Sequence, residues 1–249
     1  DPPATAAHAE TAFLAASLAC AGCATVAGNG PATDLVWPPP PDSPRVRLER
    51  VLATDRDAAG GKSLVHALTG REPAPLFERP FGVAWAGDDL VVSDPGAGRL
   101  VVVGADGRVR RTPDGLLETP TGVAACPGGI VVTEPALGRV SRVSNDLSRR
   151  ETLRGGLARP TGIVCSGADL FVLETAGHAI WYLRGDGRTG TFGRRGEGNG
   201  EFNYPAAIAA FANILLVGDT LNFRVQELDA RSGSHVRSFG RLGDAAGET

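Results

Sequence analysis

Pro80-Phe-Gly-Val-Ala84 is the first of four related segments, and the others are Pro120-Thr-Gly-Val-Ala124, Pro160-Thr-Gly-Ile-Val164 and Pro205-Ala-Ala-Ile-Ala209. The four prolines are spaced by 40, 40 and 45 residues. Fourteen positions after each proline stands an acidic residue, which gives the set Asp94, Glu134, Glu174 and Asp219. Self-similarity at a fixed period of this length is the signature of a repeat architecture.

Each repeat contains four short stretches with strand character, separated by turn residues. In the first repeat they are Gly82–Ala86, Leu90–Asp94, Arg99–Val103 and a weaker polar stretch after Ala105-Asp-Gly107. Their β-branched residues and the intervening Gly, Asp and Asn favour strands joined by tight turns. Four antiparallel strands in 40 to 45 residues make one propeller blade. We therefore predict an all-β fold, a β-propeller of four-stranded antiparallel blades with four blades visible.

The repeated residues resemble those of the NHL-repeat β-propellers. The resemblance is carried by P-x-G-[VI]-A, by the acid that ends the second strand, by the Arg-aliphatic start of the third strand and by the linker Phe192–Pro205. The chain is also similar to bacterial six-bladed propeller lipoproteins, through Val36-Trp-Pro-Pro-Pro-Pro41 and Arg45-Val-Arg47. The linker sequence begins again at Phe239 and the sequence stops before the next proline. The resemblance thus implies an incomplete ring, with about two further blades outside this sequence.

The N-terminal residues 1–26 are predicted to be a leader. Residues 11–22 are apolar and end in small residues, which is typical of a signal peptide, and the stretch is shorter than the roughly 20 residues of a membrane-spanning helix. Cys20-Ala-Gly-Cys23 resembles the end of a bacterial lipoprotein signal with Cys23 acylated, although Cys20 stands where an aliphatic residue is usual. We expect a location in the bacterial cell envelope, either periplasmic or membrane-anchored through Cys23. The chain contains no methionine, which indicates a fragment or a processed product.

Two other interpretations of Cys20 and Cys23 remain. Both cysteines could leave with a cleaved leader, or they could form a redox or metal C-x-x-C motif, which here lacks the second ligand pair that would support it. Cys126 and Cys165 stand six and five residues after their prolines, out of phase with each other. We predict that these two pack as small apolar side chains without pairing, and that no disulfide framework exists.

Residues 27–44 form a Gly/Pro-rich tether, because a run of prolines cannot donate ladder hydrogen bonds and favours an extended spacer. Residues 45–52 alternate polar and apolar side chains and are predicted to be a half-buried strand, the outer strand of a blade, within a propeller domain that covers 45–249. A short helix is expected near Ser63–Leu68. The Gly60-Gly-Lys-Ser63 segment is not a phosphate-binding loop, because the motif requires glycine where Arg56 stands.

The loops after the second strands and the linkers between repeats are expected on one face of the propeller, around the mouth of the central channel. That face is the natural binding surface of such a fold. The candidate binding residues are Asp94, Arg99, Glu134, Arg139, Glu174, His178, Asp219 and Arg224. The structural alternative is that each acid forms an ion pair or a turn cap with the arginine five positions later.

The third repeat departs from this pattern. Ala179 replaces the arginine, and His178 stands beside it, with Trp181 and Tyr182 on the strand that follows. An unpaired acid next to a histidine could bind a metal or act as a general base. The alternative is a drifted repeat with a surface histidine. No three-residue metal cluster, catalytic residue or cofactor can be assembled from the sequence, and no G-x-S-x-G motif is present.

The leading functional hypothesis is a non-catalytic, monomeric scaffold that binds a protein, peptide or glycan on its loop face. The alternative is a metal-dependent lyase or lactonase of the six-bladed propeller type, which would need His, Asp or Glu in the innermost strands. The visible innermost strands instead carry Trp85, Ala125, Cys165 and Ala210 at their fifth positions. A third hypothesis, RNA binding by the loop face, requires a basic surplus, whereas the net charge is -3. We expect no nucleic-acid partner.

Overall fold

The computed structural model describes residues 35–38, 41–43, 45–60 and 72–240. The predicted leader, with Cys20 and Cys23, lies outside these described residues, as do most of the tether and the helix expected near 63–68. Within the described part, no helix is long and apolar enough to cross a membrane.

Four sheets of four antiparallel strands make up most of the described chain. Within each sheet the strands follow one another in chain order, so every blade is a meander. The first blade contains β3 (Val83–Ala86), β4 (Asp89–Asp94), β5 (Arg99–Val103) and β6 (Val109–Arg111), and the second contains β7 (Val123–Cys126), β8 (Gly129–Glu134), β9 (Arg139–Val143) and β10 (Arg150–Arg154). The third blade contains β11 (Pro160–Ser166), β12 (Asp169–Glu174), β13 (Ala179–Leu183) and β14 (Thr189–Phe192), and the fourth contains β15 (Pro205–Phe211), β16 (Ile214–Asp219), β17 (Arg224–Asp229) and β18 (His235–Phe239).

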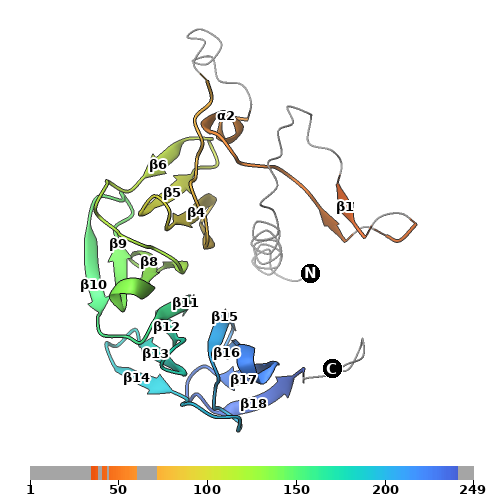
Figure 1. The fold of residues 1–249 in the computed structure, drawn as a ribbon, viewed down its shortest axis with the longest axis vertical. Coiled ribbons are helices and arrows are strands. Elements are labelled where there is room, and N and C mark those ends of the chain that lie inside the picture. Colours follow the sequence, from red (N-terminus) through yellow and green to blue (C-terminus); the bar gives the residue numbers. More distant parts are fainter. Residues whose placement is uncertain (1–34, 39–40, 44, 61–71, 241–249) are drawn as a thin grey trace.

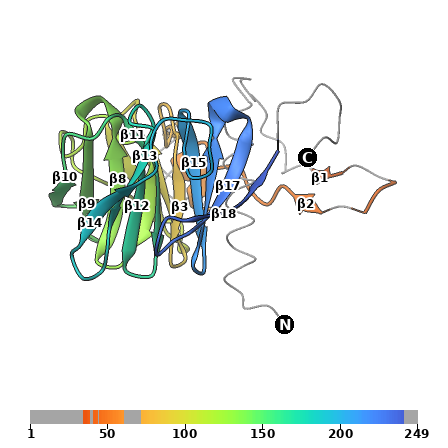
Figure 2. The same ribbon diagram turned by 90° about the horizontal axis from the view of Figure 1, so that it is seen from below.

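The blades stand side by side in an arc, with the first strand of each on the inner side and the fourth on the outer side (Figure 1). Viewed from below, the long strands run upright, so that the connections gather at two opposite ends (Figure 2). We call the end with the loops after the second strands, including the 3-10 turns η1 (Pro135–Leu137) and η2 (Thr220–Asn222), the upper loop face. The opposite end is the lower face. The predicted fold class, a propeller of four-stranded antiparallel blades, is confirmed.

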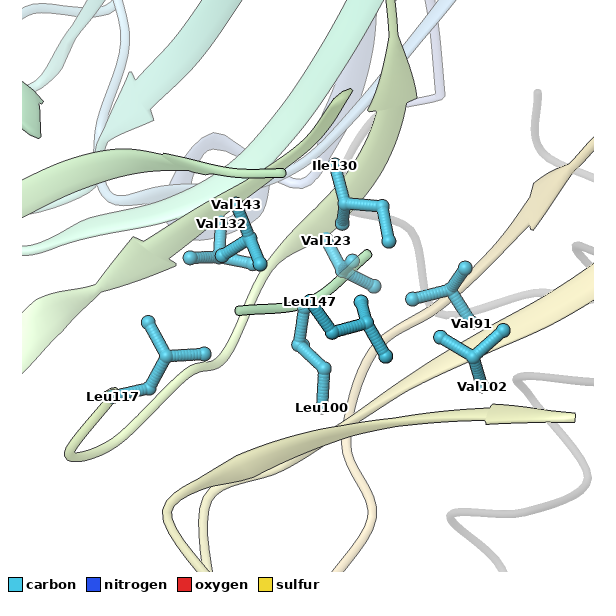
Figure 3. Close-up of a cluster of buried hydrophobic side chains, with 9 residues drawn as sticks. All are labelled: Val91, Leu100, Val102, Leu117, Val123, Ile130, Val132, Val143 and Leu147. Atoms are coloured by element: carbon cyan, nitrogen blue, oxygen red, sulfur yellow. The ribbon is translucent and has the colours of Figure 1, made fainter. Parts of the chain in front are cut away.

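Apolar side chains from neighbouring blades interlock at each junction. Between the first two blades, Val91, Leu100 and Val102 pack against side chains of the second blade such as Val132 and Val143, as Figure 3 shows. The other two junctions contain equivalent clusters, one around Trp181 and one around Phe171 and Leu215. Burying these surfaces supplies the main favourable free energy of the fold, because the sheets cannot bury both faces alone.

Hydroxyl groups connect the blades near the inner strands. Ser93 Oγ donates to the carbonyl of Thr121 at 2.6 Å, and Thr133 Oγ1 donates to the carbonyl of Thr161 at 2.8 Å. The third blade has Leu173 at the corresponding position, and there Thr175 Oγ1 donates to the carbonyl of Pro205 at 2.8 Å. Each of these bonds joins the second strand or its loop to the start of the next blade, at or just before its first strand.

The segment before the first blade departs from expectation. Only Val46–Arg47 (β2) of the strand predicted over 45–52 forms, and it pairs with Val36–Trp37 (β1). The chain then makes the short helix α2 (Asp55–Ala58), which begins with a capping box between Thr54 and Asp57. Ala58 and Leu76 are buried against Val101 and Val103 of the first blade. This segment therefore covers the outer part of the blade face that points away from the second blade.

The prediction for Cys126 and Cys165 was wrong, because the two form a disulfide with their Cα atoms 5.7 Å apart. Side chains at the fifth position of a first strand point back to the preceding blade, and those at the sixth position point forward. A one-residue phase difference is thus what brings two cysteines of adjacent inner strands together. The lower parts of the other two junctions are held by arginines instead: Arg110 bonds to Asp89 and to the carbonyl of Asn145, and Arg184 bonds to Asp169 and to the carbonyl of Arg231.

Replacing both cysteines by alanine is expected to destabilise the protein by about 4 kcal/mol in the chain-entropy estimate for a bridge spanning 39 residues. The measurement is the urea midpoint of the wild type and of Cys126→Ala/Cys165→Ala, followed by tryptophan fluorescence. Reducing agent should lower the midpoint of the wild type and leave that of the double variant unchanged. Equal midpoints for the oxidised and reduced wild type would contradict the prediction.

Candidate functional site

The upper loop face is built on the four repeated acids. Each acid ends a second strand, and its carboxylate accepts a hydrogen bond from the backbone N–H sixteen residues earlier, in the linker that enters the same blade. The donor–acceptor distances are 2.8 Å for Glu78 to Asp94, 2.9 Å for Glu118 to Glu134, 3.0 Å for Ala158 to Glu174 and 2.6 Å for Asn203 to Asp219. These carboxylates therefore hold the linkers, a role that the sequence analysis did not anticipate.

Two of the acids also bind the arginine that opens the third strand. Glu134 is fully buried and its Oε2 lies 2.7 Å from Arg139 Nη2, with Arg150 Nη1 at 3.9 Å. Asp219 is also fully buried, and its Oδ2 accepts from Arg224 Nε at 2.9 Å and from the side chains of Asn222 and Gln226. A buried carboxylate retains its charge only with such partners. None of these groups offers a free carboxylate to a ligand.

The first blade differs, because Asp94 and Arg99 form no ion pair although they face each other across β4 and β5. Asp94 instead accepts the backbone N–H groups of both Glu78 and Arg79, each at 2.8 Å. The Nε atom of Arg99 is buried and has no hydrogen-bond partner in the described part of the chain.

His178 in the third blade is buried, with only 7% of its surface exposed. Its Nδ1 accepts the backbone N–H of Tyr204 at 3.2 Å, and the two rings meet edge to face with centroids 4.6 Å apart. This bond assigns the proton of the neutral ring to Nε2. Glu174 is not hydrogen-bonded to His178, and its carboxylate instead accepts the N–H of Ala158. The two residues thus lie in one loop without forming an acid–histidine pair.

Few of the described residues are candidates for metal binding or catalysis. Within residues 35–38, 41–43, 45–60 and 72–240, no group of three or more His, Cys, Asp and Glu is placed to hold a metal ion. At the fifth position of the inner strands, Trp85 is 42% exposed, Ala125 and Ala210 are half-buried, and Cys165 is in the disulfide.

Exposed apolar side chains at the loop tips are the feature that the sequence analysis missed. Their exposed fractions are 38% for Leu137, 40% for Tyr204, 50% for Leu221 and 55% for Phe223. Phe223 and His178 occupy the left-handed position of the loop, where the first two repeats have Gly98 and Gly138. The replacement of glycine by an aromatic residue at this position was visible in the sequence alignment of the repeats.

The linker between the third and fourth blades holds Tyr204 in place. Arg224 donates to the carbonyls of Gly198 and Glu201, and Asn222 donates to the carbonyl of Gly196. The side chain of Arg194 and the N–H of Gly198 bind the Glu201 carboxylate, and they lower its pKa below the usual range. The linker is thus a fixed platform beside the exposed Tyr204, Leu221 and Phe223.

A scan against protein-family models and a search of curated proteins each find no match. Among solved structures, the chain is similar to a nidogen/laminin complex, with a TM-score of 0.57 and 21% identity over 70% of this chain and 69% of that chain. It is also similar to a streptogramin B lyase (TM-score 0.55, 16% identity, 70% of this chain and 59% of that one). A third similar structure is a gluconolactonase from Xanthomonas campestris (TM-score 0.52, 19% identity, 66% and 64%). The chain spans less than two thirds of the lyase and lactonase chains, and likeness at these identities shows the β-propeller fold.

Glu134→Gln should destabilise the protein by about 3 kcal/mol, at the low end for a broken buried pair because Arg139 keeps some contact with water. The amide oxygen can still accept the N–H of Glu118, so the change removes chiefly the charge. Urea denaturation measures the effect. The matched control is Asp106→Asn, which disturbs an exposed pair with Arg108 and should shift the stability by less than about 0.5 kcal/mol. Equal effects of the two substitutions would show that the buried charge is unimportant.

Proposed function

We propose that this protein is a non-catalytic binding scaffold of the bacterial cell envelope, which holds a polypeptide partner on its upper loop face. The observation that carries the proposal is the exposure of Leu137, Tyr204, Leu221 and Phe223 beside buried acids, Glu134 and Asp219, that are already paired within the chain. Exposed aromatic and aliphatic side chains on a rigid platform are typical anchors of protein interfaces. They favour a protein or peptide over a glycan, which would require more exposed polar groups.

The disulfide supports the envelope location. Disulfides persist in oxidising compartments such as the periplasm and are rare in the cytosol. The Cys126–Cys165 bridge is therefore in keeping with the leader that the sequence predicts for residues 1–26. Acylation of Cys23 as a membrane anchor is part of the same proposal, as is the relation to NHL-repeat lipoproteins.

The second candidate function is a lyase or lactonase, which the similar streptogramin B lyase and gluconolactonase structures favour. Such an enzyme needs convergent acid, base or metal-binding groups. Among the described residues no group of three or more His, Cys, Asp and Glu is placed to hold a metal ion, and the four repeated carboxylates of the upper loop face are engaged with linkers. The similar nidogen structure, which is a complex with laminin, is a propeller in a protein–protein assembly. The scaffold therefore remains the favoured function.

The test is a selection of random phage-displayed peptides on the immobilised, oxidised protein, followed by affinity measurements on synthetic copies of the enriched peptides. Leu221→Ser/Phe223→Asn removes two exposed anchors, and asparagine tolerates the left-handed backbone of position 223. This variant should bind at least about tenfold more weakly, the loss of roughly one anchor contact. The control Val236→Ser changes an exposed side chain on the outer strand β18 and should leave the affinity unchanged.

Failure to enrich any peptide, or affinities that are indifferent to the double variant, would overturn the scaffold proposal. The same preparation is assayed for hydrolysis of glucono-δ-lactone with added Mg²⁺, Ca²⁺ or Mn²⁺. Turnover above the uncatalysed rate that follows the protein through purification would favour the enzyme instead.

A further inference from the structure

Among the three arginines that open third strands in the described chain, Arg99 alone has no acceptor. Third strands open with arginine in three repeats, and Arg139 and Arg224 each bind a buried carboxylate at 2.9 Å or less. Arg99 makes no hydrogen bond or ion pair with any described residue, and its Nε is buried. Buried polar groups are nearly always satisfied, so an orphaned charged donor requires an explanation.

The hydrogen bonds of Asp94 explain why Arg99 is left over. In the second blade, Glu134 uses Oε1 for one linker N–H and keeps Oε2 for Arg139. Asp219 divides its oxygens in the same way between Asn203 and Arg224. Asp94 spends both oxygens on the linker, because it accepts the N–H groups of both Glu78 and Arg79. Both oxygens are thus directed at the linker, and neither lies within ion-pair distance of Arg99.

A second guanidinium lies on the other side of the same loop. The exposed side chain of Arg79 runs over Gly96, where an added Cβ would lie 3.2 Å from Arg79 Nε. Arg79 also forms no ion pair with a described residue, and the nearby acids Glu78 and Glu118 pair with neither arginine. Gly98 packs against the carbonyl of Glu118, and the next residue, Thr119, has a buried hydroxyl without a partner. The loop is thus flanked by two buried donors without partners and by the exposed side chain of Arg79.

We propose that Arg99, assisted by Arg79, binds a carboxylate of the polypeptide partner at the upper loop face of the first blade. The inference rests on the proposed scaffold function and names the chemistry of one contact. The ligand is a carboxylate because the same arginine position binds carboxylate oxygens in the second and fourth blades. The planar guanidinium fork suits a carboxylate, which reaches it through the Nη groups, because the Nε atom is closed to solvent. An acidic residue of the partner thereby completes the pair that Asp94 does not form.

The site can be tested without knowing the partner. The ¹⁵N-labelled wild-type protein is titrated with N-acetyl-glutamic acid α-amide while the arginine Nε–H resonances are followed by NMR. The Arg99 resonance is assigned by its absence in Arg99→Lys. It should shift saturably with the acid and not with the neutral N-acetyl-glutamine α-amide. Arg99→Gln should weaken binding at least about tenfold, and the control Arg108→Gln, an exposed pair on the lower face, should not change it.

Each outcome bears on the inference separately from the scaffold proposal. A saturable shift with the acid alone supports a carboxylate site, whereas a shift with inorganic phosphate alone overturns it. No shift of the wild-type Arg99 resonance also overturns it, and the Arg99→Lys variant, which keeps the charge, serves only to assign that resonance. If selected peptides bind through Leu221 and Phe223 but contain no acid that depends on Arg99, only the carboxylate site fails. If Arg99 binds the acid and no peptide is enriched, only the scaffold fails.

Discussion

The arrangement of the upper loop face depends on one interaction, the hydrogen bond from a linker N–H to the carboxylate that ends each second strand. The bond recurs at the same sequence separation in all four blades, and three of the four acids are fully buried. A carboxylate at this depth needs donors, and the linker supplies them at the point where the chain crosses from one blade to the next. The carboxylate thereby fixes the linker that leads into the first strand relative to the loop that follows the second strand.

Small differences in how this bond is made determine what each blade presents to solvent. Where the acid accepts one linker N–H, its second oxygen holds an arginine, as in Glu134 with Arg139. Asp94 accepts two, and Arg99 is left without a partner. In the third blade Ala179 replaces the arginine, and His178 bonds to the next linker instead. The acid that ends each second strand therefore has two effects. Its bond to the linker is the same in every blade, whereas its other partners differ and change what each blade exposes.

The sequence was sufficient to predict the four blades. It was not sufficient to predict the contacts between blades or the packing of the segment before the first blade. The proline spacing and the alternation of turns and β-branched residues predicted the four sheets, because these signals act within a single blade. The disulfide was missed because the facing of Cys126 and Cys165 depends on how adjacent inner strands are offset. The partner of β2 and the packing of Ala58 and Leu76 on the first blade are likewise tertiary contacts without local signal. The repeated acids were recognised in the sequence, but their hydrogen bonds to the linkers are seen only in the structure.

Four residues of the upper loop face have a left-handed backbone although they are not glycine. Arg159, His178, Tyr204 and Phe223 all have positive φ angles, between 51° and 57°, and all lie on the upper loop face. For residues other than glycine this conformation costs roughly 1 kcal/mol or more. The first two blades avoid that cost at the loop position with Gly98 and Gly138. Part of the strain at His178 and Tyr204 is offset by their mutual packing, but Phe223 is 55% exposed and gains little from its own chain. The backbone cost at Phe223 is therefore not offset by packing within the described chain, which agrees with the anchor role proposed for this residue.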